Sequence, residues 1–223
     1  TEPPFMPFLG YLVSLFFNRP YVIILYDLYP DILVNTNTIS KGSFVIKLWE
    51  IFNQIVYKKA NNLIVLSEPM KARILSKYKH IDDSKISLIS SWVDPSKIKP
   101  IPKETNYFVK ENGLENKFVV LYSGNLGRCH DIETIGYAAK NLKLHDEILF
   151  LIIGSGARLN SLKKFCSENK LDNCNFLPIQ PLAKLPYSLA CADVALVSQL
   201  ANTNGLIAPS KIYGYLATST PIA

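Results

Sequence analysis

The chain has 223 residues, of which 48% are hydrophobic and 19% are charged, and its formal net charge is +6. This composition supplies ample material for a packed core and excludes an intrinsically disordered chain. The lysines are scattered, and no basic run interleaves with aromatic residues. The scattered distribution of the positive charge argues against a nucleic-acid-binding protein. Its sign favours other anionic partners, such as nucleotides, sugar phosphates or an acidic lipid surface.

The cysteines and histidines give no metal-binding pattern. None of the four cysteines forms a C-x-x-C pair, and the three histidines stand far apart. We therefore expect reduced, structural cysteines in a cytosolic protein, with no metal and no cofactor.

An apolar stretch lies near the start of the chain, at residues 5–17. It is shorter than the ~20 residues that span a bilayer, and no secretory signal is present. The favoured interpretation is a buried helix, and the alternative is shallow contact with a membrane.

The first half of the chain alternates strand-like and helical patterns. The near-continuous apolar run at 21–26 predicts a parallel strand covered on both faces. Residues 43–60 predict an amphipathic helix capped by Ser43. A strand at 63–66, a helix at 68–78 and a strand at 85–89 follow.

Residues 94–106 carry three prolines and few large apolar side chains, which is typical of a linker. We expect a first domain over residues 1–96, a linker over 97–106, and a second domain over 107–223.

The second half repeats strand and helix four times. We expect strands at 118–123, 148–153, 175–177 and 194–198, and helices at 131–142, 157–168, 182–190 and 209–217. Such alternation predicts a parallel sheet wound with helices, in which ligands bind at the carboxyl ends of the strands. The loops that follow these strands are therefore the candidates for chemistry.

The first of these loops contains Gly124, Asn125, Arg128 and His130. Glycine permits close approach of the backbone to a ligand, and the two basic side chains can bind phosphate. An ordinary strand–helix turn with a solvated arginine fits the spacing equally well.

The second loop begins with Gly154 and Gly156 but has Leu159 where a dinucleotide fingerprint has its third glycine. A nicotinamide site is therefore disfavoured, while close approach to another ligand stays open. In the third loop, prolines flank Ile179 and Gln180. This stiff stretch can read the edge of a base, although an ordinary turn is the preferred interpretation.

The fourth loop ends in Pro209, Ser210 and Lys211. With Pro209 at the first helical position, the N–H groups of the next two residues are unpaired and can bind a diphosphate beside the lysine charge. The alternative is a surface lysine near a helix start.

Two carboxylates in the first half, Asp27 and Asp31, also follow a strand end. Asp27 can act on an acceptor hydroxyl, or it can cap the segment that follows. The chain has no P-loop, no G-x-S-x-G elbow and no H-E-x-x-H helix, which excludes the enzyme classes that these motifs define.

Seven stretches, in order along the chain, resemble glycosyltransferase family 4, and in particular its bacterial surface-polysaccharide branch with the fucosamine and colanic-acid transferases. They are Asp27-Leu28-Tyr29-Pro30-Asp31, Leu66-Ser67-Glu68-Pro69-Met70, Ser91-Trp92-Val93-Asp94, residues 122–131, Ile153-Gly154-Ser155-Gly156, Ala192-Asp193-Val194 and Pro209-Ser210-Lys211-Ile212-Tyr213-Gly214.

The resemblance implies an α/β fold with two Rossmann-like domains facing across a cleft, and it implies that the first domain is the acceptor side. It implies a retaining enzyme that moves a sugar from a nucleotide-diphosphate donor, expected to be UDP-linked, to a saccharide or lipid-linked saccharide without a metal. The implied catalytic residues are Arg128, Lys211 and Asp27. The implied donor-binding residues are Gly124, Asn125, His130, Gly154, Gly156, Gln180, Leu185, Ser210 and Tyr213.

Two departures from the family pattern affect the sugar-binding part of the site. Many members have Arg and Lys where this chain has Asn125 and His130. Many also have a pair of glutamates where we align Leu206 and Gly214. We interpret both as variation within the branch.

The resemblance also implies a chain truncated at both ends, with an incomplete first domain, a second domain lacking its C-terminal end, and lower solubility than a full-length enzyme. It implies a cytoplasmic protein in peripheral contact with the anionic inner face of a membrane. The alternatives are an inactive nucleotide-binding fragment and a sugar-nucleotide epimerase of the same fold.

Overall fold

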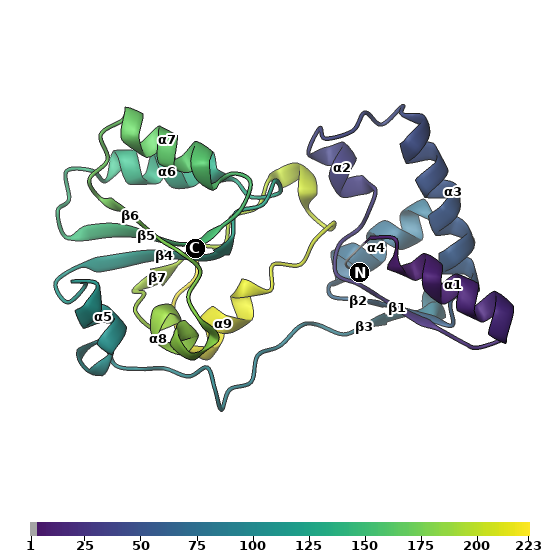
Figure 1. Ribbon diagram of the computed structural model, residues 1–223, viewed down its shortest axis with the longest axis horizontal. Helices are drawn as coiled ribbons and strands as arrows, with labels where there is room; N and C mark the ends of the chain where they lie inside the picture. Colours follow the sequence, from purple (N-terminus) through teal and green to yellow (C-terminus); the bar gives the residue numbers. More distant parts are fainter. Residues whose placement is uncertain (1–3) are drawn as a thin grey trace. The chain divides into compact units, whose positions relative to one another are not determined.

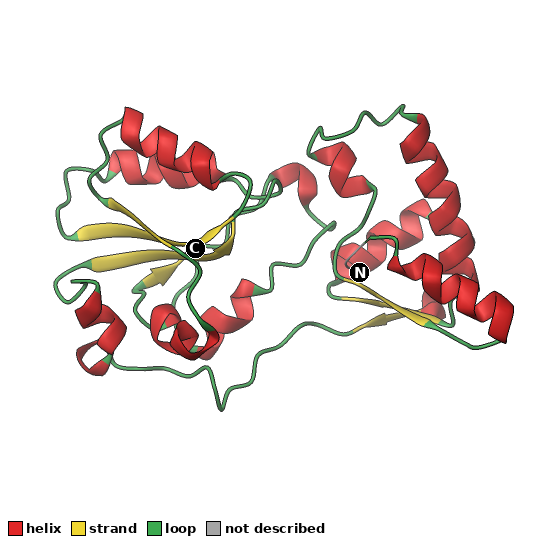
Figure 2. Cartoon of the chain, viewed as in Figure 1, coloured by secondary structure: helices red, strands yellow, loops and turns green. Residues whose placement is uncertain are grey.

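The computed structural model describes residues 4–223, which form two compact units, each built on a parallel sheet (Figure 1). The first unit runs to Ser91 and takes in Ala201–Ala208, and the second comprises Trp92–Leu200 and Pro209–Ala223. The expected α/β class with two parallel sheets is confirmed. Figure 2 shows the alternation of helices and strands that underlies it.

The first unit has a three-stranded sheet in the order β1-β2-β3. The strands are β1 (Val22–Leu25), β2 (Asn62–Val65) and β3 (Ile86–Leu88), and the helices are α1 (Met6–Phe17), α2 (Asp31–Asn35), α3 (Phe44–Lys59) and α4 (Glu68–Lys77). Helix α3 begins as expected, because the Ser43 side chain accepts from the Val45 N–H at 3.3 Å. Strand β1 is buried on one face only, with Ile23 and Leu25 inside and Val22 and Ile24 exposed.

The expectation of a buried helix at residues 5–17 is wrong. Helix α1 forms there, but Phe16 and Phe17 are 78% and 70% exposed. The helix packs on α3 along one side, where the rings of Phe8 and Phe52 lie 5.0 Å apart. Because nearly all its residues are apolar, the uncovered side is apolar too. No helix within residues 4–223 is long and apolar enough to cross a bilayer.

The second unit has a four-stranded sheet in the order β6-β5-β4-β7. Its strands are β4 (Phe118–Asn125), β5 (Ile148–Ser155), β6 (Cys174–Leu177) and β7 (Val194–Ala195), and its helices are α5 (Tyr107–Glu111), α6 (Ile132–Asn141), α7 (Leu159–Glu168), α8 (Leu185–Leu189) and α9 (Lys211–Ala217). Helices α6 and α7 lie on one side of the sheet, and α5, α8 and α9 lie on the other (Figure 1).

Alternate residues of the central strands feed two separate cores in this unit. Leu121 and Leu151 pack with α5, α8 and α9 through residues such as Phe108 and Tyr215. Tyr122 and Ile152 pack with α6 and α7 through residues such as Ile135. Cover on both faces explains why these strands are continuous apolar runs.

Three boundaries in the second unit differ from the sequence-based expectations. Strand β7 ends at Ala195, the helix expected at 182–190 begins with a 3₁₀ turn over Leu182–Lys184, and the last helix begins at Lys211. Pro209 therefore precedes the helix rather than occupying its first position, and Ser210 is the N-cap residue.

Candidate functional site

The carboxyl ends of β4 and β5 meet at a point where only glycine fits. Gly124 pairs with Gly154 in the register of the two strands, and a Cβ atom on Gly154 would lie 1.9 Å from the Gly124 carbonyl oxygen. Gly156 has a φ of +128°, and its Cβ atom would lie 2.5 Å from the Leu126 carbonyl oxygen. These glycines therefore let the first two loops pack backbone against backbone.

Lys211, the first residue of α9, reaches across the end of β4. Its ammonium group donates to the Tyr122 hydroxyl at 2.8 Å and to Nε2 of His130 at 3.1 Å, and it lies 4.4 Å from the centre of the Tyr122 ring. A Cβ atom on Gly124, which has a φ of +136°, would lie 3.3 Å from Cε of the lysine. The glycine thus leaves a passage for the lysine side chain.

Burial lowers the pKa of Lys211 to about 8. Ion pairs elsewhere in residues 4–223 do not include this lysine, so no carboxylate offsets the cost of burying its charge. Both of its hydrogen-bond partners are neutral groups. An anion placed beside Lys211 would supply the missing counter-charge.

His130 is a neutral imidazole at neutral pH. Burial, and then the nearby charge of Lys211, lower its pKa to about 4. Its Nδ1 lies 3.3 Å from the Gly127 carbonyl oxygen, while Nε2 faces the lysine ammonium. Together these contacts require the tautomer with the proton on Nδ1, so that Nε2 accepts from the lysine. His130 therefore orients Lys211 and adds no charge of its own.

Three residues that sequence reasoning overlooked hold this arrangement together. The Tyr122 hydroxyl donates to the Asn125 carbonyl at 2.9 Å, which leaves its lone pairs for Lys211. Arg158 donates to the His130 carbonyl at 2.9 Å, so the second loop supports the first. The Tyr215 hydroxyl accepts from the Ser123 N–H at 2.8 Å. A tyrosine at the end of a strand beside a glycine loop is the signal that could have indicated Tyr122.

The remaining predicted residues of the second unit lie on loops and helix starts. Arg128 is exposed on the same turn as His130. Gln180 donates within its own loop to the Pro178 carbonyl at 2.8 Å, and Leu185 packs against the core around Tyr215. Exposed Ser210 and partly buried Tyr213 flank Lys211 along the chain.

Two residues of interest belong to the first unit. Asp27 is partly buried and forms an isolated antiparallel bridge with Ile207. Leu206, which we aligned with a glutamate of the family, is 1% exposed, and its carbonyl accepts from the Leu28 N–H at 2.9 Å. In the second unit, Gly214, aligned with the other glutamate, is buried against Leu189, whose Cδ1 would lie 3.0 Å from an added Cβ atom.

In chemical terms, the second unit brings together an uncompensated ammonium group and two glycine loops at the carboxyl ends of parallel strands. An anionic group bound there would gain a charge-assisted hydrogen bond worth about 1.5–3 kcal/mol. Carboxyl ends of strands are also where open α/β sheets bind their ligands. The arrangement is suited to a phosphate-bearing ligand.

Comparison with known proteins identifies the family of the chain. Residues 103–208 match the family model described as glycosyl transferases group 1. The chain is 32% identical over 202 residues to a probable glycosyltransferase, WbjE, of Pseudomonas aeruginosa. The matched region covers 91% of this chain and 50% of that protein. It is 26% identical over 180 residues to a putative colanic acid biosynthesis glycosyl transferase, WcaI, of Escherichia coli, covering 79% of this chain and 43% of that protein.

The fold is shared with solved structures. Anabaena HepE in complex with UDP-glucose superimposes with a TM-score of 0.78 at 15% identity, over 97% of this chain and 56% of that one. This chain thus spans about half the length of the curated relatives it matches. On the family match, the identity to WbjE and the shared fold, the chain belongs to the group 1 glycosyltransferases.

Proposed function

We propose that the second unit binds the diphosphate of a nucleotide-sugar donor, expected to be UDP-linked, and that the protein transfers the sugar with retention to a saccharide or lipid-linked saccharide. The process served would be surface-polysaccharide synthesis. Family membership supports sugar transfer, and HepE was solved with UDP-glucose. WcaI carries the description of a colanic acid transferase, which supports the polysaccharide context.

The observation that carries the proposal is the charge of Lys211. A lysine whose pKa is lowered to about 8 by burial, with only neutral partners, costs stability in the absence of a ligand. Perturbed ionisable groups of this kind cluster at functional sites. A diphosphate beside Gly124 and Lys211 would replace the missing counter-charge. Arg128, which lies on the same turn as His130, is the proposed second cation.

In the reaction we propose, the bond between the sugar anomeric carbon and the diphosphate oxygen breaks while the acceptor hydroxyl oxygen bonds to the same face of that carbon. The diphosphate leaves with the electron pair of the broken bond, and Lys211 and Arg128 stabilise its charge as it develops. The acceptor hydroxyl loses its proton, for which Asp27 is the proposed base. This scheme needs no metal, because the cations neutralise the leaving group.

The remaining roles follow the same proposal. The base of the nucleotide would lie along Gln180 and Leu185, with Gly154, Gly156, Asn125, His130, Ser210 and Tyr213 around the phosphates and ribose. The proposed domains are residues 1–96 and 107–223, with a linker at 97–106. The exposed phenylalanines of α1 support peripheral contact with a membrane, and the net charge of +6 supports an anionic one.

Calorimetric titration with UDP, GDP and ADP tests the donor proposal. We expect UDP to bind, and Lys211→Ala and Arg128→Ala each to weaken it by about 1.5–3 kcal/mol, or 10- to 150-fold. Lys140→Ala, a substitution of a surface lysine on α6, is the matched control and should leave UDP affinity unchanged. Absence of nucleotide binding by a folded chain would favour the inactive-fragment alternative. Turnover of a nucleotide sugar without any acceptor would favour the epimerase.

A further inference from the structure

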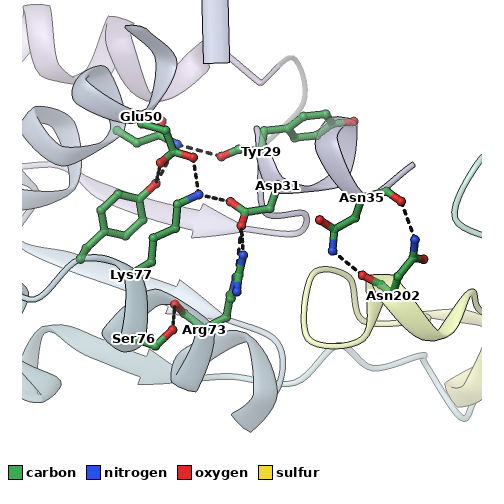
Figure 3. Close-up of polar contacts among 10 residues, drawn as sticks. Tyr29, Asp31, Asn35, Glu50, Arg73, Ser76, Lys77 and Asn202 are labelled. Carbon is green, nitrogen blue, oxygen red and sulfur yellow. Dashed lines mark hydrogen bonds and ion pairs between the residues drawn. The ribbon is translucent and has the colours of Figure 1, made fainter. Parts of the chain in front are cut away.

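The first unit contains a buried carboxylate that none of the proposed chemistry uses. Asp31, the first residue of α2, is 7% exposed. One of its oxygens accepts from Nε of Arg73 at 3.1 Å and from Nη2 of the same guanidinium, and the other contacts the ammonium group of Lys77. Figure 3 shows both cations reaching Asp31 from α4.

A second carboxylate is satisfied in the same way. Glu50 on α3 contacts the Lys77 ammonium group through Oε1 at 2.5 Å and accepts from the Tyr78 hydroxyl through Oε2 at 3.0 Å (Figure 3). Burial raises the pKa of Tyr78, so its hydroxyl remains a donor. The oxygens of both carboxylates are therefore already engaged by donors of the protein.

A cavity of about 350 Å³ adjoins this network, within the size range of small-ligand sites. Its walls include three cations and two carboxylates, a surplus of one positive charge. The cations are Lys41, Arg73 and Lys77, and the carboxylates are Asp31 and Glu50. A volume of this size accommodates one sugar ring or a phosphate group.

The cavity retains hydrogen-bond donors in excess of acceptors. Arg73 commits two of the five N–H donors of a guanidinium to Asp31, and its side chain is 45% exposed. Lys41 is exposed and takes part in none of the ion pairs within residues 4–223. Because Asp31 binds Nε and Nη2 of Arg73, it fixes the orientation of the guanidinium. The remaining N–H donors are thereby held in place to bind a ligand.

We propose that this cavity is an anion-binding site of the first unit, which takes a carboxylate or phosphate group carried on a ligand no larger than a monosaccharide. Arg73 and Lys41 bind the anion, and Asp31 positions Arg73. If the protein transfers sugars as proposed above, the site recognises an acidic group on the acceptor. Recognition of an acceptor rests on the proposed function, whereas binding of an anion in this cavity does not.

Binding of two probes, inorganic phosphate and glucuronate, tests the site, with glucose as the neutral control. Chemical shifts of the whole chain are followed by NMR during each titration. Lys41→Ala removes one cation without exposing the buried carboxylate, and we expect about a fivefold loss of affinity, the upper end for an exposed ion pair. Ser76→Trp fills the cavity and should abolish binding, while Lys140→Ala on the second unit should change nothing.

Each outcome decides for or against the site. Binding of glucuronate alone supports an acceptor with a carboxylate, binding of phosphate alone supports one with a phosphate, and binding of both supports recognition of either anion. Binding of neither probe, or binding that Lys41→Ala and Ser76→Trp leave unchanged, overturns the proposal. UDP titrated into the same samples reports on the second unit separately, so failure of one site is distinguishable from failure of the other.

Discussion

Replacing Lys211 with Met should stabilise the protein at neutral pH while weakening nucleotide binding. Methionine keeps the aliphatic length of the side chain but removes the charge, which is buried without a carboxylate. Burial lowers the lysine pKa from 10.5 to about 8. A difference of about 2.5 units corresponds to about 3 kcal/mol of destabilisation when the lysine is charged in both the folded and the unfolded chain.

The sign of the pH dependence follows from this shift. Below about pH 8 the lysine is charged in both the folded and the unfolded chain, so the full free-energy cost of burying its charge destabilises the folded state. Between pH 8 and 10.5 the unfolded chain binds more protons than the folded chain, and the free energy of unfolding of the wild type rises with pH through this contribution. Above 10.5 the lysine is neutral in both states and the cost disappears.

Urea unfolding of the wild type and Lys211→Met at several pH values between 7 and 10.5 measures the effect. We expect the variant to be more stable by about 1–3 kcal/mol at pH 7, since loss of the hydrogen bond to Tyr122 offsets part of the gain, and the advantage to shrink towards pH 10.5. Taking the difference between the two proteins cancels the titration of all other groups. A variant that is less stable at pH 7, or a difference that does not change with pH, would refute the reasoning.

Three further outcomes follow from the described contacts. In urea unfolding, Gly154→Ala should lower the free energy of unfolding by about 3 kcal/mol or more, because its Cβ atom would meet a carbonyl oxygen at 1.9 Å. The control Gly42→Ala should be nearly neutral, since its Cβ atom would have nothing within 4 Å. The ring shifts of His130 should stay constant by NMR from pH 7, where Lys211 is already charged, down to pH 5. The free energy of unfolding should fall as the pH drops from 6.5 towards 4, because the unfolded chain takes up the proton first, and a titration midpoint near 6.5 would disprove this. Asn106→Ala should cost about 2–3 kcal/mol by thermal unfolding, since the buried amide donates to the Tyr187 carbonyl and caps α5; a shift in the midpoint of less than about 2 °C would contradict it.

The wound parallel sheet of the second unit was predictable because its strands are continuous apolar runs followed by amphipathic helices. Residues 119–122 and 150–153 are buried on both faces, so burial and hydrophobicity coincide there. Strand β7 was predicted too long, because the residues after Ala195 are apolar without being paired as a strand over their whole length.

The apolar stretch at residues 5–17 shows where hydrophobicity fails to indicate burial. A helix without a polar face gives no signal for which side meets its neighbours, and α1 covers one side only. The sequence therefore predicted the helix correctly but its burial wrongly.

The candidate site was only partly predictable. Gly124, His130 and Lys211 were selected individually from separate loops. The fold brings them together although Lys211 lies about 90 residues after the first loop in the sequence. Tyr122 was missed, because a tyrosine in an apolar run looks like any core residue and only its place beside a glycine loop set it apart. Its hydroxyl becomes significant only when Lys211 arrives from a helix late in the chain.

The Asp31 network was hidden for a different reason. Arg73 and Lys77 lie four residues apart on α4, a spacing common on solvated helix faces. Nothing local shows that both point to one buried carboxylate more than forty residues earlier.

The most direct test of the donor site is a pair of calorimetric titrations, with UDP and with uridine, each on the wild type and on Lys211→Ala. If Lys211 binds the diphosphate, the substitution weakens UDP binding by about 10- to 150-fold and leaves uridine binding unchanged. The wild type should also take up a fraction of a proton on binding UDP at pH 8, seen as heat that depends on the buffer, because an anion restores the charged form of the lysine. Equal UDP affinity for both proteins, with no proton uptake, would contradict the account.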